Sequence, residues 1–461
     1  MDETVVFKAL YDRYITPTKA KRDRYLGIEI EMPIVNYNGT PVDFSVVHKL
    51  TEAFAARFHM HPDGTDDEGH IYSLKDNRTG DIFSYDCSYN NLELSLGKGK
   101  DINQLYKRFK LYCFFIQNFL ALYRHTLTGM GINPNRKINR HVPILNERYR
   151  MLFHHLTSYE NYTHPEGFHS YPDFGMFCSA SQVQIDVEHS KLVDTINLFS
   201  MLEPVKALLF SNSVMPEEEG GLLCVRDMLW ENSMQGYNPK NIGMFEETLK
   251  TESDLLHYIA GTSIYCTMRN GRYVNFKPVP VLQYFKNPSL TGEFWNGTEY
   301  EAVTIEPDLS DLEHLRTFKF EDLTYRGTIE FRSCCCQPLS ESMTVAAFHA
   351  GLFEMTSELN HLLSRSRWLF QKDITPSRLR KTFCSCIIPP HISRLELKEL
   401  LLRILHLAKE GLKRRGYREE WFLEPLYERA KQLTNPAKQY ICGLHNDIPV
   451  NELVRRYAVI D

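Results

Sequence analysis

Polar and apolar residues alternate strictly in four short stretches of the chain. In the first stretch, Glu29 and Glu31 alternate with isoleucine and methionine. Successive side chains of a β-strand point to opposite faces, so the two glutamates share one face and the apolar residues share the other. The same alternation occurs at 91–96, 182–187 and 329–332. Each stretch is therefore predicted to be a strand with one polar and one apolar face.

Apolar residues recur at helical spacing in four longer stretches. The clearest is 393–433, where leucines such as Leu397 and Leu401 mark one face and Lys and Arg lie between them. Gly416 and Pro425 interrupt this stretch, which predicts two or three helices there. The predicted helices cover 103–128, 191–211, 340–366 and 393–433, and the predicted strands cover 25–35, 91–96, 181–187, 263–269 and 328–333.

The polar faces of the four alternating strands carry mostly carboxylates and amides, whereas surface strands usually carry threonine, lysine and mixed charges. The acids are Glu29, Glu31, Glu93 and Glu330. If these strands are neighbours, the carboxylates repel one another and some take up protons, unless a divalent cation lies among them. Oxygen ligands of this kind suit magnesium or manganese. The alternative is a sheet with one solvated face and one face packed on helices, which is common in antiparallel sheets.

One arginine accompanies the acids on these strands. Arg332 follows Glu330 by two residues and shares its face. A guanidinium in that position can bind a phosphate while the carboxylate binds a metal, which favours phosphoryl transfer. No Walker A motif is present and no G-x-G-x-x-G follows a strand, so P-loop and Rossmann sites are excluded.

Composition and charge argue against a nucleic-acid partner, a membrane partner and a disulfide framework. The 461 residues carry a net charge of -5 without a basic stripe, so no nucleic-acid partner is expected. No apolar run approaches the ~18 residues that span a bilayer, and the first residues do not resemble a secretory signal, so no membrane partner is expected. The 11 cysteines are an odd number, which favours a reducing cytoplasm over a disulfide framework. The run 334–336 is three consecutive cysteines, which would not converge on one metal.

Several short motifs follow one another between about Arg24 and Gly351. They are G-x-E-x-E at 27–31, Asp86 with Glu93 seven residues later, G-x-G-x-x-P at 129–134, P-x-x-x-x-R-Y at 143–149, the strand 181–186, R-x-x-x-W at 226–230, and the segment 314–332 with Arg326 inside it. In this order and spacing they resemble the glutamate–cysteine ligase family, in the branch that contains the plant and many bacterial enzymes. That family shares its sheet architecture with glutamine synthetase.

The resemblance implies an α+β fold with a curved, mostly antiparallel sheet of about six strands and helices on its apolar face. No repeat or Gly/Ser linker divides the chain, so residues 1–461 are predicted to form a single catalytic domain. Its C-terminal helical portion, about 340–461, is predicted to pack on the sheet. The turn-rich stretches 63–69, 160–171 and 287–300 are predicted to be surface loops.

The resemblance also implies a site. Two or three magnesium ions, for which manganese could substitute, and the ATP phosphates would lie among Glu29, Glu31, Asp86, Glu93, Gln182 and Glu330. ATP would contact Glu29, Glu31, Gln182 and Arg332, and the catalytic residues would be Arg332, Glu93 and Glu330. The small-molecule substrates would contact Arg148, Tyr149, Arg226, Trp230 and Lys240.

In that family, ATP phosphorylates the side-chain carboxylate of glutamate, and the amine of cysteine then displaces phosphate to give γ-glutamylcysteine, in glutathione biosynthesis. Metal ions neutralise and align the charged groups, and no protein nucleophile is needed.

Three departures from the family pattern leave other functions open. Cysteines stand near position 335 where the family has an aspartate, Gln184 replaces an asparagine, and a longer loop follows Trp230 with Lys240 in place of an arginine. The chain could therefore join a different acid or amine in specialised metabolism. It could also be a non-catalytic binding or regulatory descendant. A guanidino kinase-like transfer is the third option, although that family holds its nucleotide chiefly with arginines.

Overall fold

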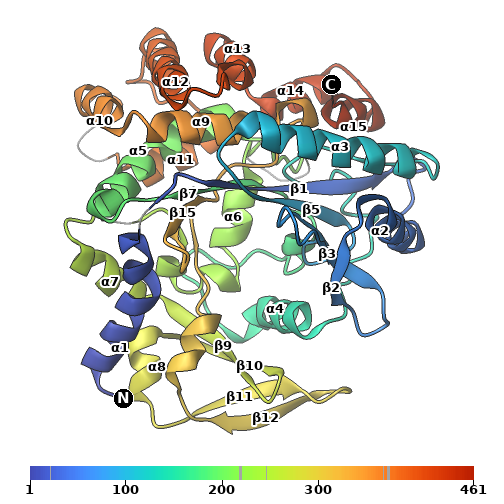
Figure 1. The fold of residues 1–461 in the computed structure, drawn as a ribbon, viewed down its shortest axis with the longest axis vertical. Coiled ribbons are helices and arrows are strands. Elements are labelled where there is room, and N and C mark those ends of the chain that lie inside the picture. The colour runs from blue at the N-terminus through green and yellow to red at the C-terminus, as the bar shows by residue number, and fades with distance from the viewer. Residues whose placement is uncertain (21, 217–220, 246, 367, 371–373, 461) are drawn as a thin grey trace.

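The computed structural model describes residues 1–461 except 21, 217–220, 246, 367, 371–373 and 461. Its centre is a nine-stranded sheet in which every paired strand runs antiparallel to its neighbour (Figure 1). In order across the sheet the strands are β14 (Glu321–Leu323), β15 (Thr328–Phe331), β7 (Ser181–Asp186), β1 (Leu26–Asn36), β5 (Asn91–Gly99), β4 (Ile82–Tyr85), β3 (Ile71–Lys75) and β2 (His61–Thr65), and β6 (His125–Leu127) pairs with the end of β1.

A second, four-stranded sheet lies away from the first, at the bottom of the view in Figure 1. Its strands are β12 (Tyr300–Ile305), β11 (Leu290–Trp295), β10 (Arg272–Pro280) and β9 (Ser263–Arg269) in that order. A short parallel pair, β8 (Ile242–Gly243) and β13 (Phe318–Lys319), completes the strands of the described residues.

Helices lie on both sides of the main sheet, and those on its apolar face form two layers (Figure 1). The helices are α1 (Glu3–Leu10), α2 (Phe44–Phe58), α3 (Ile102–Ala121), α4 (Glu147–Thr157), α5 (Leu192–Phe210), α6 (Val225–Glu231), α7 (Glu252–Ala260), α8 (Val281–Lys286), α9 (Thr344–Phe353), α10 (Thr356–Arg365), α11 (Pro376–Cys384), α12 (Arg394–Arg415), α13 (Glu424–Gln432), α14 (Pro436–His445) and α15 (Val450–Ala458). Helices α3 and α9 contact strands of the sheet, α5 packs on α11, and α12 packs outside α9. None of the described helices is both long and apolar enough to cross a membrane.

The alternation in β1 places its apolar residues under these helices. Ile28, Ile30 and Met32 are buried in one continuous core. Burying an aliphatic side chain contributes about 1.5–3 kcal/mol, so this face binds the sheet to the helices. The polar residues of β1 consequently point to the other side of the sheet, toward α4, α6 and the four-stranded sheet (Figure 1).

The mixed helix and antiparallel-sheet fold is confirmed, but several details differ from the expectation. The main sheet has nine strands instead of about six, and it is not strongly curled. The stretch 340–366 forms two helices, α9 and α10, because the chain leaves the helix at Glu354 and Met355. The stretches 63–69 and 287–300 hold parts of β2, β11 and β12, so they are not simply loops. Residues 367, 371–373 and 461 of the C-terminal portion lie outside the described residues.

Candidate active site on the polar face of the main sheet

Four neighbouring strands bring the predicted acids together. In the register of the sheet, Glu31 on β1 lies opposite Glu93 on β5. Glu29 lies opposite Gln182 on β7, and β7 pairs in turn with β15, which carries Glu330. The strands that were predicted separately from the sequence are thus contiguous, in the order β15, β7, β1, β5. Their polar residues form one acidic face.

Amides link the carboxylates of this acidic face. The Gln182 side-chain N–H donates to Glu31 Oε1 at 2.9 Å, and the Ala180 backbone N–H donates to Glu31 Oε2 at 2.7 Å. Gln184 donates to Glu29 Oε1 at 3.1 Å and to Glu330 Oε1 at 2.6 Å. These neutral donors orient the acids but do not neutralise their charge.

The acidic face has few cations for its carboxylates. Arg332 forms an ion pair with Glu330, and Arg148 on α4 and Arg226 on α6 approach from the other side of the site. Glu29, Glu31 and Glu93 accept hydrogen bonds from amides, a backbone N–H or a hydroxyl instead. For example, Ser95 donates to Glu93 Oε1 at 2.6 Å.

Burial and mutual repulsion raise the pKa values of these acids. Burial first, then the charges of Asp86 and Glu93, raises the pKa of Glu31 to about 8. Burial and Asp86 likewise raise the pKa of Glu93 to about 7. The pKa of Glu29 lies well above its ordinary value, because of burial and the nearby Glu330 and Glu93. Without a bound cation, protons therefore occupy part of this site near neutral pH.

The donor set fits magnesium or manganese. The side-chain oxygen of Gln182 is buried, and no hydrogen-bond donor of the described chain reaches it, so it is available as a ligand. Carboxylate and amide oxygens are the ligands that these ions prefer. The described clusters in which three ligand atoms lie within 4.8 Å of one another are Asp66, Glu68 and His70, and Cys224, Asp227 and Cys384, so neither contains a sheet glutamate. Magnesium often takes only one or two carboxylates and completes its shell with water and phosphate, which suits acids spread over several strands.

Asp86 and two residues of α4 lie beside the acidic face. Asp86 directly follows β4, and the Tyr149 hydroxyl donates to Tyr85 O at 3.1 Å and to Asp86 Oδ1 at 3.4 Å. Burial raises the pKa of Asp86, and the charge of Arg148 opposes that rise. Arg148 itself is exposed, and its guanidinium lies over the Tyr149 ring, 5.4 Å from the ring centroid.

Helix α6 supplies two more of the predicted substrate residues. Arg226 is buried, donates to the backbone oxygen of Arg332 at 3.1 Å, and has an Nε that no described acceptor reaches. Trp230 stacks on Phe318 with ring centroids 4.5 Å apart, and its buried indole N–H also lacks an acceptor in the described chain. Arg332 lies over the same Phe318 ring, 5.4 Å from its centroid. These N–H groups offer donors to a ligand.

Lys240 is placed differently from the other predicted substrate residues. Its Nζ lies over the Tyr258 ring of α7, 5.7 Å from the ring centroid. Among the described residues, its contact is therefore with α7 and not with the sheet glutamates.

Two polar residues of the face were not assigned a role from the sequence. Asp322 on β14 lies opposite Glu330, accepts from the Thr317 hydroxyl at 2.8 Å, and has its pKa raised to about 6 by burial. Strand β14 has only three residues, too few for a recognisable alternation. Gln184 was expected on the polar face, and its bridge between Glu29 and Glu330 gives it a positioning role there.

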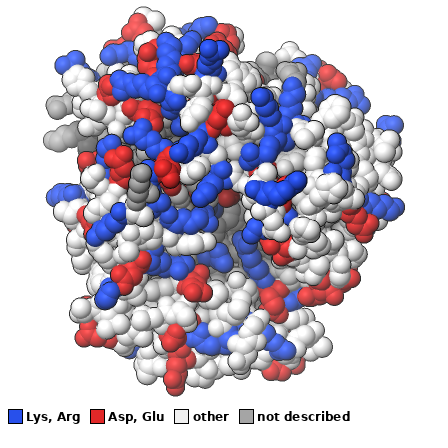
Figure 2. Space-filling view, viewed as in Figure 1, with Lys and Arg blue, Asp and Glu red and all other residues white. Residues whose placement is uncertain are grey.

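The surface around the site is rich in cations. Figure 2 shows Lys and Arg side chains gathered around a hollow near the centre of the face that Figure 1 also presents. In this view the hollow lies between the main sheet and the four-stranded sheet. A cleft lined by positive charge concentrates anionic ligands, so the surroundings complement the acidic floor.

Comparison with known proteins gives relatives of one kind. No family model matches the chain. It is 26% identical over 276 residues to a chloroplastic glutamate–cysteine ligase of Brassica juncea, in an alignment that covers 58% of this chain and 50% of the relative. The corresponding enzyme of Arabidopsis thaliana is 25% identical over 276 residues, with 58% and 49% covered. The chain thus spans about half the length of the curated relatives it matches.

Among solved structures, a bifunctional glutathione synthetase from Pasteurella multocida aligns with a TM-score of 0.45 at 12% identity, covering 99% of this chain and 53% of that one. A glutamate–cysteine ligase from Francisella tularensis in complex with AMP aligns with a TM-score of 0.45 at 11% identity, covering 95% and 89%.

Proposed function

We propose that this chain, a homologue of the glutamate–cysteine ligases, is an ATP- and magnesium-dependent ligase that joins a carboxylate to an amine. The proposed substrates are glutamate and cysteine, and the product is γ-glutamylcysteine. The observation that carries the proposal is the acidic face, where Glu31 is buried and Glu29 and Glu93 are half-buried, and where none of the three forms an ion pair with a described Lys or Arg.

A carboxylate is a poor electrophile, so the reaction needs a leaving group. The glutamate side chain attacks the γ-phosphorus of ATP, which releases ADP and gives an acyl phosphate. The neutral amine of the second substrate then attacks the acyl carbon. The C–O bond to phosphate breaks, phosphate leaves, and the amine loses a proton to solvent. No protein nucleophile takes part.

Each region of the site has a role in these reaction steps. Magnesium would be held by Glu29, Glu31, Asp86, Glu93, Gln182 and Glu330, and when bound it supplies charge neutralisation for the phosphates. Arg332, oriented by Glu330, binds the phosphate that is transferred. Arg148 and the free N–H groups of Arg226 and Trp230 orient the amino-acid substrates.

The raised pKa values connect the acidic face to metal binding. Glu31 and Glu93, with pKa values of about 8 and 7, hold protons near neutral pH when no cation is present. Cation binding requires the ionised carboxylates, so it releases these protons. Binding of magnesium is therefore expected to strengthen as pH rises from 6 to 8.

The test is phosphate release by the purified protein with ATP, magnesium and glutamate, run against a panel of amines that includes cysteine, with product masses recorded. Release that needs both glutamate and cysteine, with the mass of the dipeptide, supports the proposal. Release with another amine keeps the chemistry and changes the substrate. Failure to bind magnesium–ATP contradicts the proposal and favours a non-catalytic descendant.

The substrates are the part of this proposal most open to change. The chain departs from the family pattern in the loop after Trp230, and Lys240 of that loop lies against α7. The amine panel therefore includes short aliphatic amines and other amino acids beside cysteine.

A further inference from the structure

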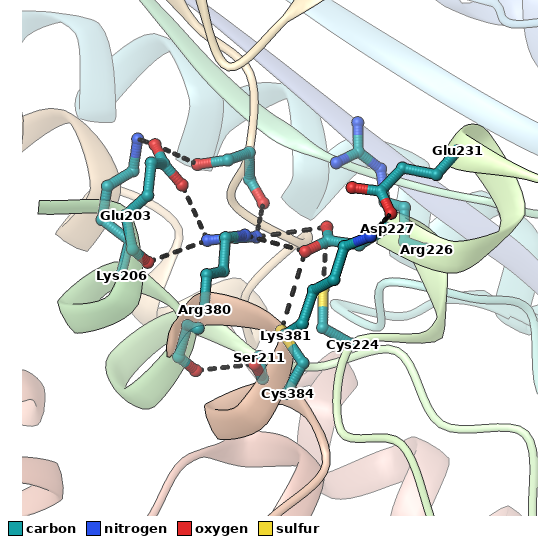
Figure 3. Close-up of polar contacts among 12 residues, drawn as sticks. Glu203, Lys206, Ser211, Cys224, Arg226, Asp227, Glu231, Arg380, Lys381 and Cys384 are labelled. Atoms are coloured by element: carbon teal, nitrogen blue, oxygen red, sulfur yellow. Dashed lines mark hydrogen bonds and ion pairs between the residues drawn. The ribbon is translucent and has the colours of Figure 1, made fainter. Parts of the chain in front are cut away.

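Three cysteines and one aspartate converge behind the acidic face, close to α6. Cys224 directly precedes α6, Asp227 lies in its first turn, Cys384 ends α11, and Cys335 follows β15. All four are buried or nearly so, and the three cysteines are free thiols. Figure 3 shows the sulfur atoms of Cys224 and Cys384 pointing toward the Asp227 carboxylate.

Cys224, Asp227 and Cys384 lie at distances found between ligands of one metal ion, and Cys335 contacts Cys224 beside this group of three. Cys224 Sγ lies 3.5 Å from Cys335 Sγ and 3.3 Å from Asp227 Oδ1. Cys384 Sγ lies 3.6 Å from Asp227 Oδ2. Ligand atoms of Cys224, Asp227 and Cys384 all lie within 4.8 Å of one another. In a tetrahedral zinc site with Zn–S bonds of about 2.3 Å, neighbouring sulfur atoms lie about 3.8 Å apart.

We propose that Cys224, Cys335, Cys384 and Asp227 bind a thiolate-preferring divalent cation, zinc being the expected ion, in a closed structural site. Soft sulfur ligands select zinc over magnesium, so this site and the acidic face take different metals. With Cys335 turned from Cys224 toward the group of three, three thiolates and one carboxylate make four ligands, the number that a closed structural zinc site has. Binding releases the thiol protons that the free cysteines carry.

The neighbouring arginine supplies the outer support that such a site needs. Arg380 donates from Nε to Asp227 Oδ2 at 2.7 Å and from Nη2 to Asp227 Oδ1 at 3.1 Å. Carboxylate ligands of metals are usually held by hydrogen bonds of this kind. Three thiolates, a carboxylate and a divalent cation sum to a charge of −2, which the buried Arg380 guanidinium halves.

The site would fix the elements that carry substrate-binding residues. Cys224 and Asp227 flank Arg226, and Cys335 follows Arg332 by three residues. Arg226 and Arg332 are already joined by a hydrogen bond of 3.1 Å. A metal that ties α6, α11 and the segment after β15 together would hold these two arginines at the edge of the acidic face. Arg226 and Arg332 are therefore the groups that metal loss is expected to displace.

The first experiment measures metal in the purified full chain by inductively coupled plasma mass spectrometry. We expect about one zinc per chain after exhaustive dialysis against a magnesium-free buffer. Protein refolded with cobalt chloride is expected to show the thiolate-to-cobalt charge-transfer absorption of a tetrahedral sulfur site. This second readout uses the wild-type chain, so it does not depend on a variant folding.

Variants assign the ligands. Cys384→Ser is expected to lose at least about nine-tenths of the zinc and the cobalt absorption, whereas Cys386→Ser, two residues away and exposed, is expected to keep both. Wild-type protein that is folded, has all three thiols reduced and contains no zinc would overturn the proposal. The contacts among Cys224, Cys335, Cys384 and Asp227 would then be thiol hydrogen bonds. A disulfide from Cys224 to Cys335 or Cys384 in protein purified under reducing conditions would overturn it as well.

Discussion

Two charged regions inside this molecule differ in how their carboxylates are compensated: one pairs them with cations, and the other surrounds them with neutral amides. Behind the apolar face, Glu203 and Lys206 on α5 and Arg380 on α11 form ion pairs, with Arg380 Nη1 2.7 Å from Glu203 Oε2. Burial alone would raise the pKa of Glu203, but the two cations lower it to about 2. On the acidic face, Glu29 and Glu31 contact amides, and their pKa values rise. We call the first region, Glu203, Lys206 and Arg380, the charged core.

This difference in pairing indicates which region serves folding stability and which serves ligand binding. A buried charge that is paired with an opposite charge destabilises the folded state little, whereas removing its partner is strongly destabilising. A buried charge without a partner is costly in the free protein and is stabilised only when a ligand supplies the opposite charge. The charged core is therefore expected to matter for folding, and the acidic face for binding and turnover.

The largest effect is expected from neutralising one acid of the acidic face. Glu29→Gln keeps the side-chain shape but removes a ligand charge, so we expect the rate of phosphate release to fall at least about 100-fold, or roughly 3 kcal/mol. The melting temperature is expected to stay the same or rise, because one repulsive carboxylate is gone. Turnover is measured by phosphate release and folding by thermal denaturation.

The control for this variant is Glu301→Gln, which changes an exposed strand acid of β12 and is expected to leave both quantities unchanged. Glu330→Gln repeats the test at the partner of Arg332. Near-normal phosphate release in both Glu29→Gln and Glu330→Gln would show that the acidic face is not the catalytic site.

For the charged core we expect a substitution to lower stability and to leave turnover nearly unchanged. Lys206 is fully buried between Glu203 and Glu321, so Lys206→Met removes the cation beside Glu321 and leaves Glu203 with Arg380 as its ion-pair partner. We expect a loss of about 3–5 kcal/mol in the free energy of unfolding, measured by urea titration. The folded fraction that remains is expected to turn over at nearly the normal rate. Lys191→Met, at the exposed start of α5, is the control, and an equal loss in both variants would refute the distinction.

More of the acidic face than of the charged core could be predicted from the sequence. Strict alternation fixed which face Glu29 and Glu31 share, because the strand period is two. It could not fix their neighbours: Glu31 meets Glu93 about sixty residues later and Gln182 about 150 residues later, and such pairings leave no local signal. The predicted strands left out β2, β3, β4, β6 and β14, which have three to five residues each, too few for a clear alternation.

The charged core was missed for a different reason. Glu203 and Lys206 are three residues apart on a helix, which usually indicates a solvated surface pair. The signal against that interpretation was present in α5 itself, where apolar residues occur on all sides. A helix that is apolar all round is buried, so its few charges must be buried and paired as well.

The next prediction concerns pH. Glu31 and Glu93 have folded-state pKa values of about 8 and 7, above the ordinary value of 4.5, so between pH 4.5 and 8 these two groups bind more protons in the folded chain than in the unfolded chain. Stability then falls as pH rises through that window. Glu203 of the charged core does not contribute in that window, since the stability from Glu203 is lost only as pH falls from 4.5 toward 2.

We therefore expect the melting temperature of the metal-free protein to fall by a few degrees between pH 6 and pH 8. Added magnesium and ATP should raise it more at pH 8 than at pH 6, because the ions bind the deprotonated acids. Differential scanning calorimetry at both pH values measures both effects. Glu31→Gln should flatten the pH dependence, and a slope that is unchanged in this variant would mean that other groups cause it.

The smallest expected effect tests the neutral donors of the acidic face. The Ser95 hydroxyl donates to Glu93, and this hydrogen bond lowers the pKa of Glu93 against the larger effect of burial. Ser95→Ala removes the donor, so the pKa of Glu93 should rise further and less of the carboxylate is ionised at pH 7. We expect magnesium affinity at pH 7, measured by calorimetry, to fall by less than about tenfold. The loss should shrink at pH 9, where Glu93 is ionised with or without the donor, and an equal loss at both pH values would show that Ser95 acts by orientation alone.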